Sequence, residues 1–192
     1  TQFSTTVNGQ SYNFVNNADV TITPDNGVYK FSDLEIFEGT YLNFKYTANT
    51  ADLDQRFIIP NDFVDTTTLT VKVQNSISDT ETVTYAKATD ITQLTSTSTV
   101  YFCQEVEGGR FEIYFGDGIV SKALVDGNII TLDYVITNKT EANGVSSFTA
   151  PSSIAGETAI SLQTISRAEG GSEPETINSI KLKAPLDYAS QG

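Results

Sequence analysis

The sequence predicts a mainly β fold, built from antiparallel β-sandwich or meander domains with one short helix near the C-terminal end. The first observation is composition. The 192 residues include 11 Phe and 9 Tyr and are rich in Thr, and aromatic and β-branched side chains suit a pleated, half-buried surface. The second is a series of Asn-Gly and Asp-Gly pairs, which adopt the positive φ of tight hairpin turns at little cost. The third is the alternation of apolar and polar residues over short runs, which is typical of strands with one buried face.

The first ninety residues consist of short apolar runs separated by turn residues. Asn8-Gly9 is the strongest hairpin signal, and the segments on either side of it are predicted to pair. A second turn is predicted at residues 24–27, and Pro60 ends a short apolar strand. The strands predicted in this part of the chain cover residues 3–7, 11–15, 18–23, 28–31, 40–48, 56–59, 67–74 and 81–86, and the last of them pairs back on its predecessor.

Residues 100–144 contain three apolar runs with almost no connecting loop between them. Turns of the Gly-Gly, Asp-Gly and Asp-Gly-Asn type separate the runs at residues 107–109, 117–118 and 126–128. Because such turns join neighbouring antiparallel strands, we expect a meander over residues 100–137.

A polar segment at residues 92–99, TQLTSTST, is expected to be a linker between two β-domains or an exposed edge strand. Two further strands are predicted at residues 146–150 and 158–167. The predicted domains are an N-terminal β-domain at residues 1–92, a β-meander domain at residues 93–171, and a C-terminal helix with the truncated start of a following domain at residues 172–192.

The predicted helix follows a Gly-Gly-Ser break. Ser172 is a good N-cap, and the acidic residues after it favour the positive end of the helix dipole. Ile177, Ile180 and Ala184 lie on one helical face, and Pro185 ends the helix.

The formal net charge of −13, from 24 acidic and 11 basic residues, argues against nucleic acid as a direct partner. Phosphate backbones are bound by clustered Lys and Arg, whereas the basic residues here are scattered among acidic ones. Anionic membrane surfaces are disfavoured for the same reason, and no apolar run approaches the roughly 18 residues of a membrane-spanning helix. We interpret the acidic excess as a solvated surface. The chain does not begin with Met, so we expect it to start inside a longer protein or after processing.

Catalytic and zinc-binding arrangements that need histidine are excluded, because the sequence contains none. The single cysteine, Cys103, lies in an apolar strand and is interpreted as a small buried hydrophobic residue rather than a reactive thiol. The Gly-Gly pairs do not fit a phosphate-binding loop. Asn138-Lys139-Thr140 matches a glycosylation sequon, which we interpret as a chance match.

Two groups of oxygen-bearing residues are candidate sites. The first consists of oxygen-bearing residues at turns that could bind calcium, namely Asp52, Asp54, Asp117, Asp126 and Asn128. No EF-hand loop contains them, and hairpin turns require such residues anyway, so the turn interpretation is preferred. The second is a possible glycosidase pair among Glu105, Glu107 and Glu112, which we expect to be solvated and therefore unsuitable as general acids. No catalytic, cofactor-binding or metal site is predicted.

An ordered series of segments gives the chain a family resemblance. The segments are FEIYFGDG at residues 111–118, the turn at 126–128, residues 134–138 and 143–144, supported by QRFIIPN at 55–61, residues 68–73 and IKLKAPLDYASQ at 180–191. Together they resemble the baseplate wedge proteins of T4-type contractile-tailed bacteriophages, in particular the gene product six class, related to baseplate J-like proteins. The chain is similar to an excised fragment of such a protein.

The resemblance implies a structural role in the virion, with no enzymatic activity and no cofactor. It implies contacts with other baseplate wedge proteins in the ring around the tail hub, and with a second copy in the full-length protein, as a homodimer or ring. It implies a location in the tail baseplate, assembled in the host cytoplasm. A carbohydrate-binding or adhesin-like β-sandwich module remains the alternative, although sugar-binding faces usually contain Trp and this chain has none.

Overall fold

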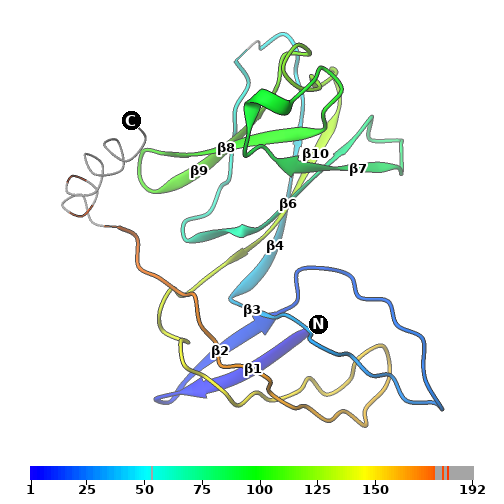
Figure 1. The fold of residues 1–192 in the computed structure, drawn as a ribbon, viewed down its shortest axis with the longest axis vertical. Coiled ribbons are helices and arrows are strands. Elements are labelled where there is room, and N and C mark those ends of the chain that lie inside the picture. Colours follow the sequence, from blue (N-terminus) through cyan, green and yellow to red (C-terminus); the bar gives the residue numbers. More distant parts are fainter. Residues whose placement is uncertain (53, 176–178, 180, 182–192) are drawn as a thin grey trace.

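The computed structural model describes residues 1–52, 54–175, 179 and 181, and it confirms a mainly β protein (Figure 1). The described residues form two sheets, joined by coil segments. The small sheet has the order β1-β2-β3, with β1 at Gln2–Val7, β2 at Gln10–Val15 and β3 at Phe37–Glu38. The large sheet has the order β4-β10-β6-β7-β8-β9-β5, with β4 at Thr40–Thr47, β5 at Phe57–Ile58, β6 at Val64–Gln74, β7 at Thr82–Lys87, β8 at Val100–Val106, β9 at Arg110–Phe115 and β10 at Ile129–Ile136.

The first predicted hairpin is confirmed. β1 and β2 pair antiparallel, with Val7 opposite Gln10. Asn8 and Gly9 both have positive φ, 50° and 86°, as a two-residue turn that follows the twist of the strands requires.

The predicted meander is correct for its first two strands and wrong for the third. β8 and β9 pair across the Gly-Gly turn, with Val106 opposite Arg110. β10 does not pair with β9; it lies between β4 and β6 and is antiparallel to both. Four of its apolar side chains are almost completely buried, so β10 is a central strand whose place is set by the core and not by the turn before it.

The strand order also departs from a purely antiparallel sheet. β7 and β8 are parallel, with Ala86 opposite Val100. The segment between them contains a short 3-10 helix, η1, at Ile91–Gln93. Strands from both sides of the expected domain boundary near residue 92 therefore belong to one sheet, and that boundary does not coincide with a break in the hydrogen bonding.

The large sheet curls around the main core. The hydroxyl of Tyr46 on β4 donates a hydrogen bond to the carbonyl of Ile58 on β5, so a side chain bridges the two edges of the sheet. The Tyr46 ring also lies 5.3 Å from that of Phe57. The enclosed core consists of apolar residues from strands of the large sheet and its connecting segments, including Phe57, Ile59, Val71, Ile113, Ile130, Leu132 and Tyr134.

Four predicted strands are not formed. Residues 18–23, 28–31, 146–150 and 158–167 are extended coil, with isolated bridges only at Asp25–Val28 and Ser4–Thr149. Their apolar pattern is strand-like, but a strand also needs a hydrogen-bonding neighbour, and none of the described segments pairs with them along their length. These coils lie beside the small sheet (Figure 1). The helix predicted from residue 172 lies mostly outside the described residues; residues 172–175 are not helical, whereas 179 and 181 are.

Candidate protein-binding groove

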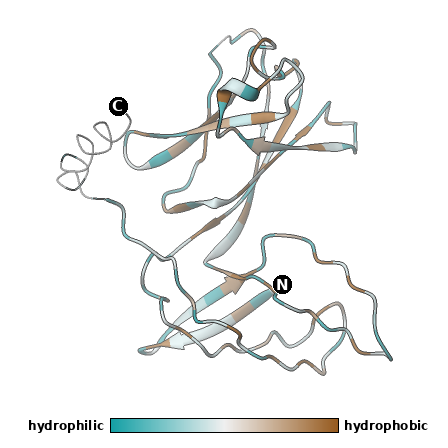
Figure 2. Ribbon diagram, viewed as in Figure 1, coloured by the Kyte–Doolittle hydropathy of each residue, from teal (hydrophilic) through white to brown (hydrophobic). Residues whose placement is uncertain are grey.

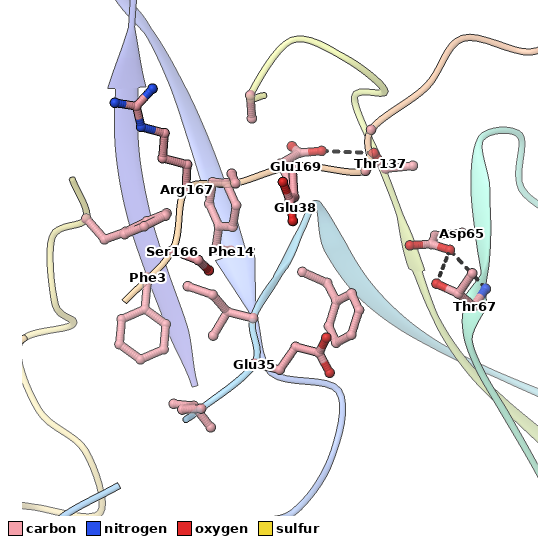
Figure 3. Close-up of a pocket in the computed structure, with 18 of the residues that line it drawn as sticks. Phe3, Phe14, Glu35, Glu38, Asp65, Thr67, Thr137, Ser166, Arg167 and Glu169 are labelled. Atoms are coloured by element: carbon pink, nitrogen blue, oxygen red, sulfur yellow. Dashed lines mark hydrogen bonds between the residues drawn. The ribbon is translucent and has the colours of Figure 1, made fainter. Parts of the chain in front are cut away.

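A broad open groove of about 2400 Å³ lies between the small sheet, one end of the large sheet and the coil segments. Figure 3 shows Phe3 and Phe14 of the small sheet on one side and Asp65 and Thr67 of β6 on the other, with Glu38 between them. Pockets for small molecules usually measure about 300–1,000 Å³. The groove is therefore better matched to a segment of a macromolecule.

The floor of the groove is the core of the small sheet. Phe3 and Phe14 are almost completely buried in a cluster that also contains Tyr12 and Ala142. The ring of Phe14 meets that of Phe148 edge to face, with 4.9 Å between the centroids. This packing fixes the floor before any partner binds.

Two extended coil segments line the groove, at residues 27–36 and 154–175. Several of their large apolar side chains are exposed, in contrast to the floor. Leu162 and Ile165 are 44% and 74% exposed on one segment, and Tyr29 is 50% exposed on the other. Figure 2 shows the hydrophobic stretches along these coils. Apolar surface gathered along a groove is typical of a surface that a partner covers.

The rim of the groove contains a strained aromatic residue. Phe63 has φ of 59°, in the left-handed region that bulky residues rarely adopt, and its carbonyl accepts a hydrogen bond from Thr137 N at 3.0 Å. The Lys139 ammonium lies 4.5 Å from the centroid of the Phe63 ring and 2.9 Å from a carboxylate oxygen of Glu173. These contacts hold the segment after β10 against the start of β6.

Glu38 joins the two sheets beside the groove. Its Oε2 accepts hydrogen bonds from the Thr137 hydroxyl at 3.0 Å and the Asn138 amide at 2.8 Å, while its Oε1 accepts one from Asn138 Nδ2 at 2.6 Å. The next residue, Gly39, donates its amide to the carbonyl of Asn13 on β2 at 2.9 Å. The chain thus passes from the small sheet into the large one through a joint that these hydrogen bonds hold.

The groove is acidic. Lys30, Lys139 and Arg167 are the basic residues among those lining it. The acidic residues that line it are more numerous, namely Asp33, Glu35, Glu38, Asp62, Asp65, Glu105, Glu157, Glu169, Glu173 and Glu175. A partner segment that carries Lys or Arg would therefore complement its charge.

Cys103 is half-buried on β8 and packs against the main core. Burial raises the pKa of its thiol, and only a weaker influence from Lys87 opposes this. A thiol with a raised pKa is a poor nucleophile, so the structure agrees with the interpretation of Cys103 as a packing residue.

One of the three glutamates considered for catalysis is not solvated as expected. Glu105 and Glu107 are exposed, but Glu112 is only 9% exposed. Its Oε1 accepts a hydrogen bond from Gln104 Nε2 at 2.6 Å and lies 3.5 Å from Arg56 Nη1. Glu112 lies on the face of β9 opposite Ile113, which packs in the main core, and β9 itself lies between β8 and β5, an arrangement that the position of Glu112 near a hairpin does not reveal.

Most of the aspartates and the asparagine considered for calcium accept hydrogen bonds from backbone amides. Within the part of the chain that the structure describes, four of the five accept a backbone N–H, and Asp54 is exposed. The distances from donor nitrogen to acceptor oxygen are 3.3 Å for Asp54 to Asp52, 2.9 Å for Ile119 to Asp117, 3.2 Å for Thr50 to Asp126 and 2.8 Å for Val125 to Asn128. The amides of Ile119 and Val120 lower the pKa of Asp117. The described part of the chain contains no cluster of three or more His, Cys, Asp or Glu suited to a metal ion.

The structure also bears on the glycosylation sequon and on membrane-spanning helices. The Asn138 side chain, the acceptor position of the sequon, is engaged by Glu38 as described above. Among the residues that the structure describes, no helix is long and apolar enough to cross a membrane.

Sequence reasoning missed the groove. The exposed apolar residues of its coil segments belong to the runs at residues 28–31 and 158–167, which the sequence predicts to be strands. Their alternation is strand-like, and such a pattern does not show whether a strand has a neighbour to pair with.

The chain was compared with known proteins. It matches the family model described as "Bacteriophage baseplate wedge protein gp6, third domain" over residues 43–145, which is more than half of its length. It is also similar to "Baseplate wedge protein gp6" of Enterobacteria phage T4, with 26% identity over 202 residues that cover 94% of this chain and 29% of the relative. The chain therefore spans less than a third of the length of this curated relative. The resemblance stated from residues 111–118 and the segments around them is confirmed, and the chain belongs to the bacteriophage baseplate wedge protein gp6 family.

Proposed function

We propose that this chain is a structural, non-catalytic part of a contractile-tail baseplate wedge. The family match carries this proposal, since it covers most of the large sheet. Its partners are other wedge proteins and, in the full-length protein, a second copy. The family match favours this role over a carbohydrate-binding or adhesin-like module.

The structure supports a role in assembly in two ways. The hydrogen-bonded joint at Glu38 and Gly39 ties the two sheets together, so the chain can act as a rigid spacer. The groove offers exposed apolar side chains over a buried floor, an arrangement that resembles the apolar centre of a protein interface.

The test is genetic removal followed by imaging. A phage whose gene for the full-length protein carries an early stop codon is grown in a non-suppressing host, and its tails are imaged by electron microscopy. We expect incomplete baseplates, and their restoration when the intact gene is supplied in trans. Complete baseplates in the absence of the protein would refute the proposal.

A further inference from the structure

We propose that the groove binds an extended, basic segment of another wedge protein by strand addition, with residues 158–167 as the receiving strand. The inference rests on the proposed function and deepens it, because it names the surface, the mode of binding and the chemistry of the partner. Three observations support it: backbone groups without hydrogen bonds to other described residues, exposed apolar side chains, and the size and charge of the groove.

The first observation is that residues 158–167 make no hydrogen bond, by backbone or by side chain, within the part of the chain that the structure describes. The residues on either side of this stretch are held by backbone hydrogen bonds. Ile154 and Glu157 exchange backbone hydrogen bonds of 2.9 Å, and Ala168 N donates to Val145 O at 2.7 Å. An extended stretch of ten residues is thus anchored at both ends, and none of its donors or acceptors is paired with another described residue. Such a row of unpaired groups is a template for an additional strand.

The second observation is that the same stretch is a strand by its sequence. Ile160 and Leu162 alternate with polar residues, and this pattern predicted a strand that the structure leaves unpaired. Leu162 and Ile165 remain substantially exposed, and so does Tyr29 on the coil that lines the groove together with it. A strand added here would cover these side chains while pairing the backbone, and both changes favour binding.

The third observation is the size and charge of the groove, which indicate the kind of partner that it can bind. The groove is several times larger than a typical small-molecule pocket, so it suits a length of polypeptide. The excess of carboxylates along it favours a segment that carries Lys or Arg. A second copy of this chain has the same net charge of −13, so its segments would complement the groove poorly. The occupant is therefore an extended basic segment of a different protein.

A proline scan tests the pairing. Proline is placed in turn at Ser161, Leu162, Gln163 and Thr164 of the full-length protein, and alanine is placed at the same positions as matched controls. Proline removes the N–H and favours extended backbone in the residue before it, and no N–H of this stretch is used within the described chain. The thermal unfolding of the variant chains should therefore be unchanged.

In an added strand, the N–H groups of alternate residues point to the partner. Supplied in trans to a phage that lacks the protein, two alternate proline variants should enter baseplates at least tenfold less than wild type. The other two proline variants, and the alanine variants at Ser161, Gln163 and Thr164, should match wild type. Normal entry by all four proline variants, or an equal loss at all four, would overturn strand addition.

Cross-linking identifies the occupant. A photoreactive benzoylphenylalanine replaces Leu162 in assembled particles, and Ile77, which is 87% exposed in the turn between β6 and β7 and does not line the groove, takes the same probe as the control. The expected product from position 162 is a peptide of a different wedge protein in which Lys and Arg outnumber Asp and Glu, and position 77 should not yield that peptide. No product at position 162, an acidic peptide, or a peptide of a second copy would contradict the inference. These outcomes would not refute the proposed baseplate role, because that role is tested separately by removing the protein.

Discussion

The hydroxyl of Thr68 takes the place of a backbone carbonyl in the centre of the large sheet. Its Oγ1 accepts a hydrogen bond from the amide of Val135 at 3.0 Å and donates one to the carbonyl of Asp65 at 2.7 Å. The register between β6 and β10 shifts at this point, so that Asp133 lies opposite Thr70 and Val135 opposite Asp65. Thr68 is buried, and it satisfies two backbone groups that the bulge would otherwise leave unpaired.

Thr68→Val should lower the free energy of unfolding by about 2 kcal/mol, because it keeps the shape of the side chain but leaves a buried amide and a buried carbonyl without partners. Urea unfolding followed by circular dichroism measures the change. Thr84→Val is the control, since Thr84 is exposed on β7 and its variant should stay within about 0.5 kcal/mol of wild type. Equal stabilities for the two variants would show that Thr68 does not support the bulge.

Gly39→Ala should be strongly destabilising. Gly39 has φ of 131°, and an added Cβ would lie 2.0 Å from the carbonyl oxygen of Ile136. Because that neighbour is backbone in a central strand, the strain cannot be relieved by a side-chain movement, and we expect a loss of about 3 kcal/mol.

Gly27→Ala provides the matched control for Gly39→Ala. Gly27 also has a positive φ, 78°, but no atom lies within 4 Å of its added Cβ. Its variant should lose only about 1 kcal/mol, the cost of the backbone conformation alone. Thermal unfolding compares the two, and a penalty at Gly39 no larger than that at Gly27 would contradict the close approach.

Asp133→Asn should destabilise the protein at neutral pH by about 2 kcal/mol. Asp133 is buried on β10, lies 3.1 Å from Lys72 Nζ, and accepts a hydrogen bond from Asn43 Nδ2 at 2.6 Å. The expected loss of stability is smaller than for a fully buried ion pair, because the Lys72 side chain is partly exposed. Glu81→Gln, at an exposed residue before β7, should change stability by less than about 0.5 kcal/mol.

The effect of Asp133→Asn should also depend on pH. Burial opposes ionisation of Asp133, but hydrogen bonds from Asn43, Lys72 and Tyr41 outweigh it and lower the pKa of the carboxyl below its ordinary 3.8. A lowered folded-state pKa adds stability above the unfolded value, and that stability is lost as the pH falls through the folded value. Urea unfolding of both proteins from pH 7 to pH 2 should therefore show a constant difference down to about pH 4 and a shrinking one below it. A difference that grows on acidification would contradict this sign.

Glu38→Gln should loosen the joint between the sheets. Both carboxylate oxygens accept hydrogen bonds there, and an amide group would turn one acceptor into a donor that faces another donor. We expect a loss of about 2 kcal/mol and faster hydrogen exchange at the amide of Asn138. Glu35→Gln, at an exposed residue three positions earlier, is the control. Unchanged exchange at Asn138 would mean that Glu38 does not hold the joint.

Local turn chemistry made part of the fold predictable. Asn8-Gly9 and Gly108-Gly109 each fixed a hairpin, because their positive φ values follow from the residue types themselves. The strands next to these turns were correct in kind and nearly so in extent. Family membership was also predictable, since the ordered segments around residues 111–118 are a property of the sequence.

The pairing of distant strands was not predictable from the same patterns. Leu132 and Tyr134 identify β10 as buried, but nothing in their spacing says that the neighbours are β4 and β6 rather than β9. Burial of Glu112 follows from the strands around it and not from its own neighbours in the chain. The alternation of apolar and polar residues specifies which face of a strand is apolar, but it does not specify which strand lies beside it.

The sequence by itself determined that the chain is β-rich, where two of its hairpins turn, and to which family it belongs. These depend on the backbone preferences of single residues and on an ordered series of residues. Only the tertiary structure decided that β10 is central, that β7 and β8 are parallel, and that residues 158–167 lie along a groove without a partner. The physical reason is that a strand is completed by hydrogen bonds to a neighbour, and the neighbour is chosen by packing across the whole molecule.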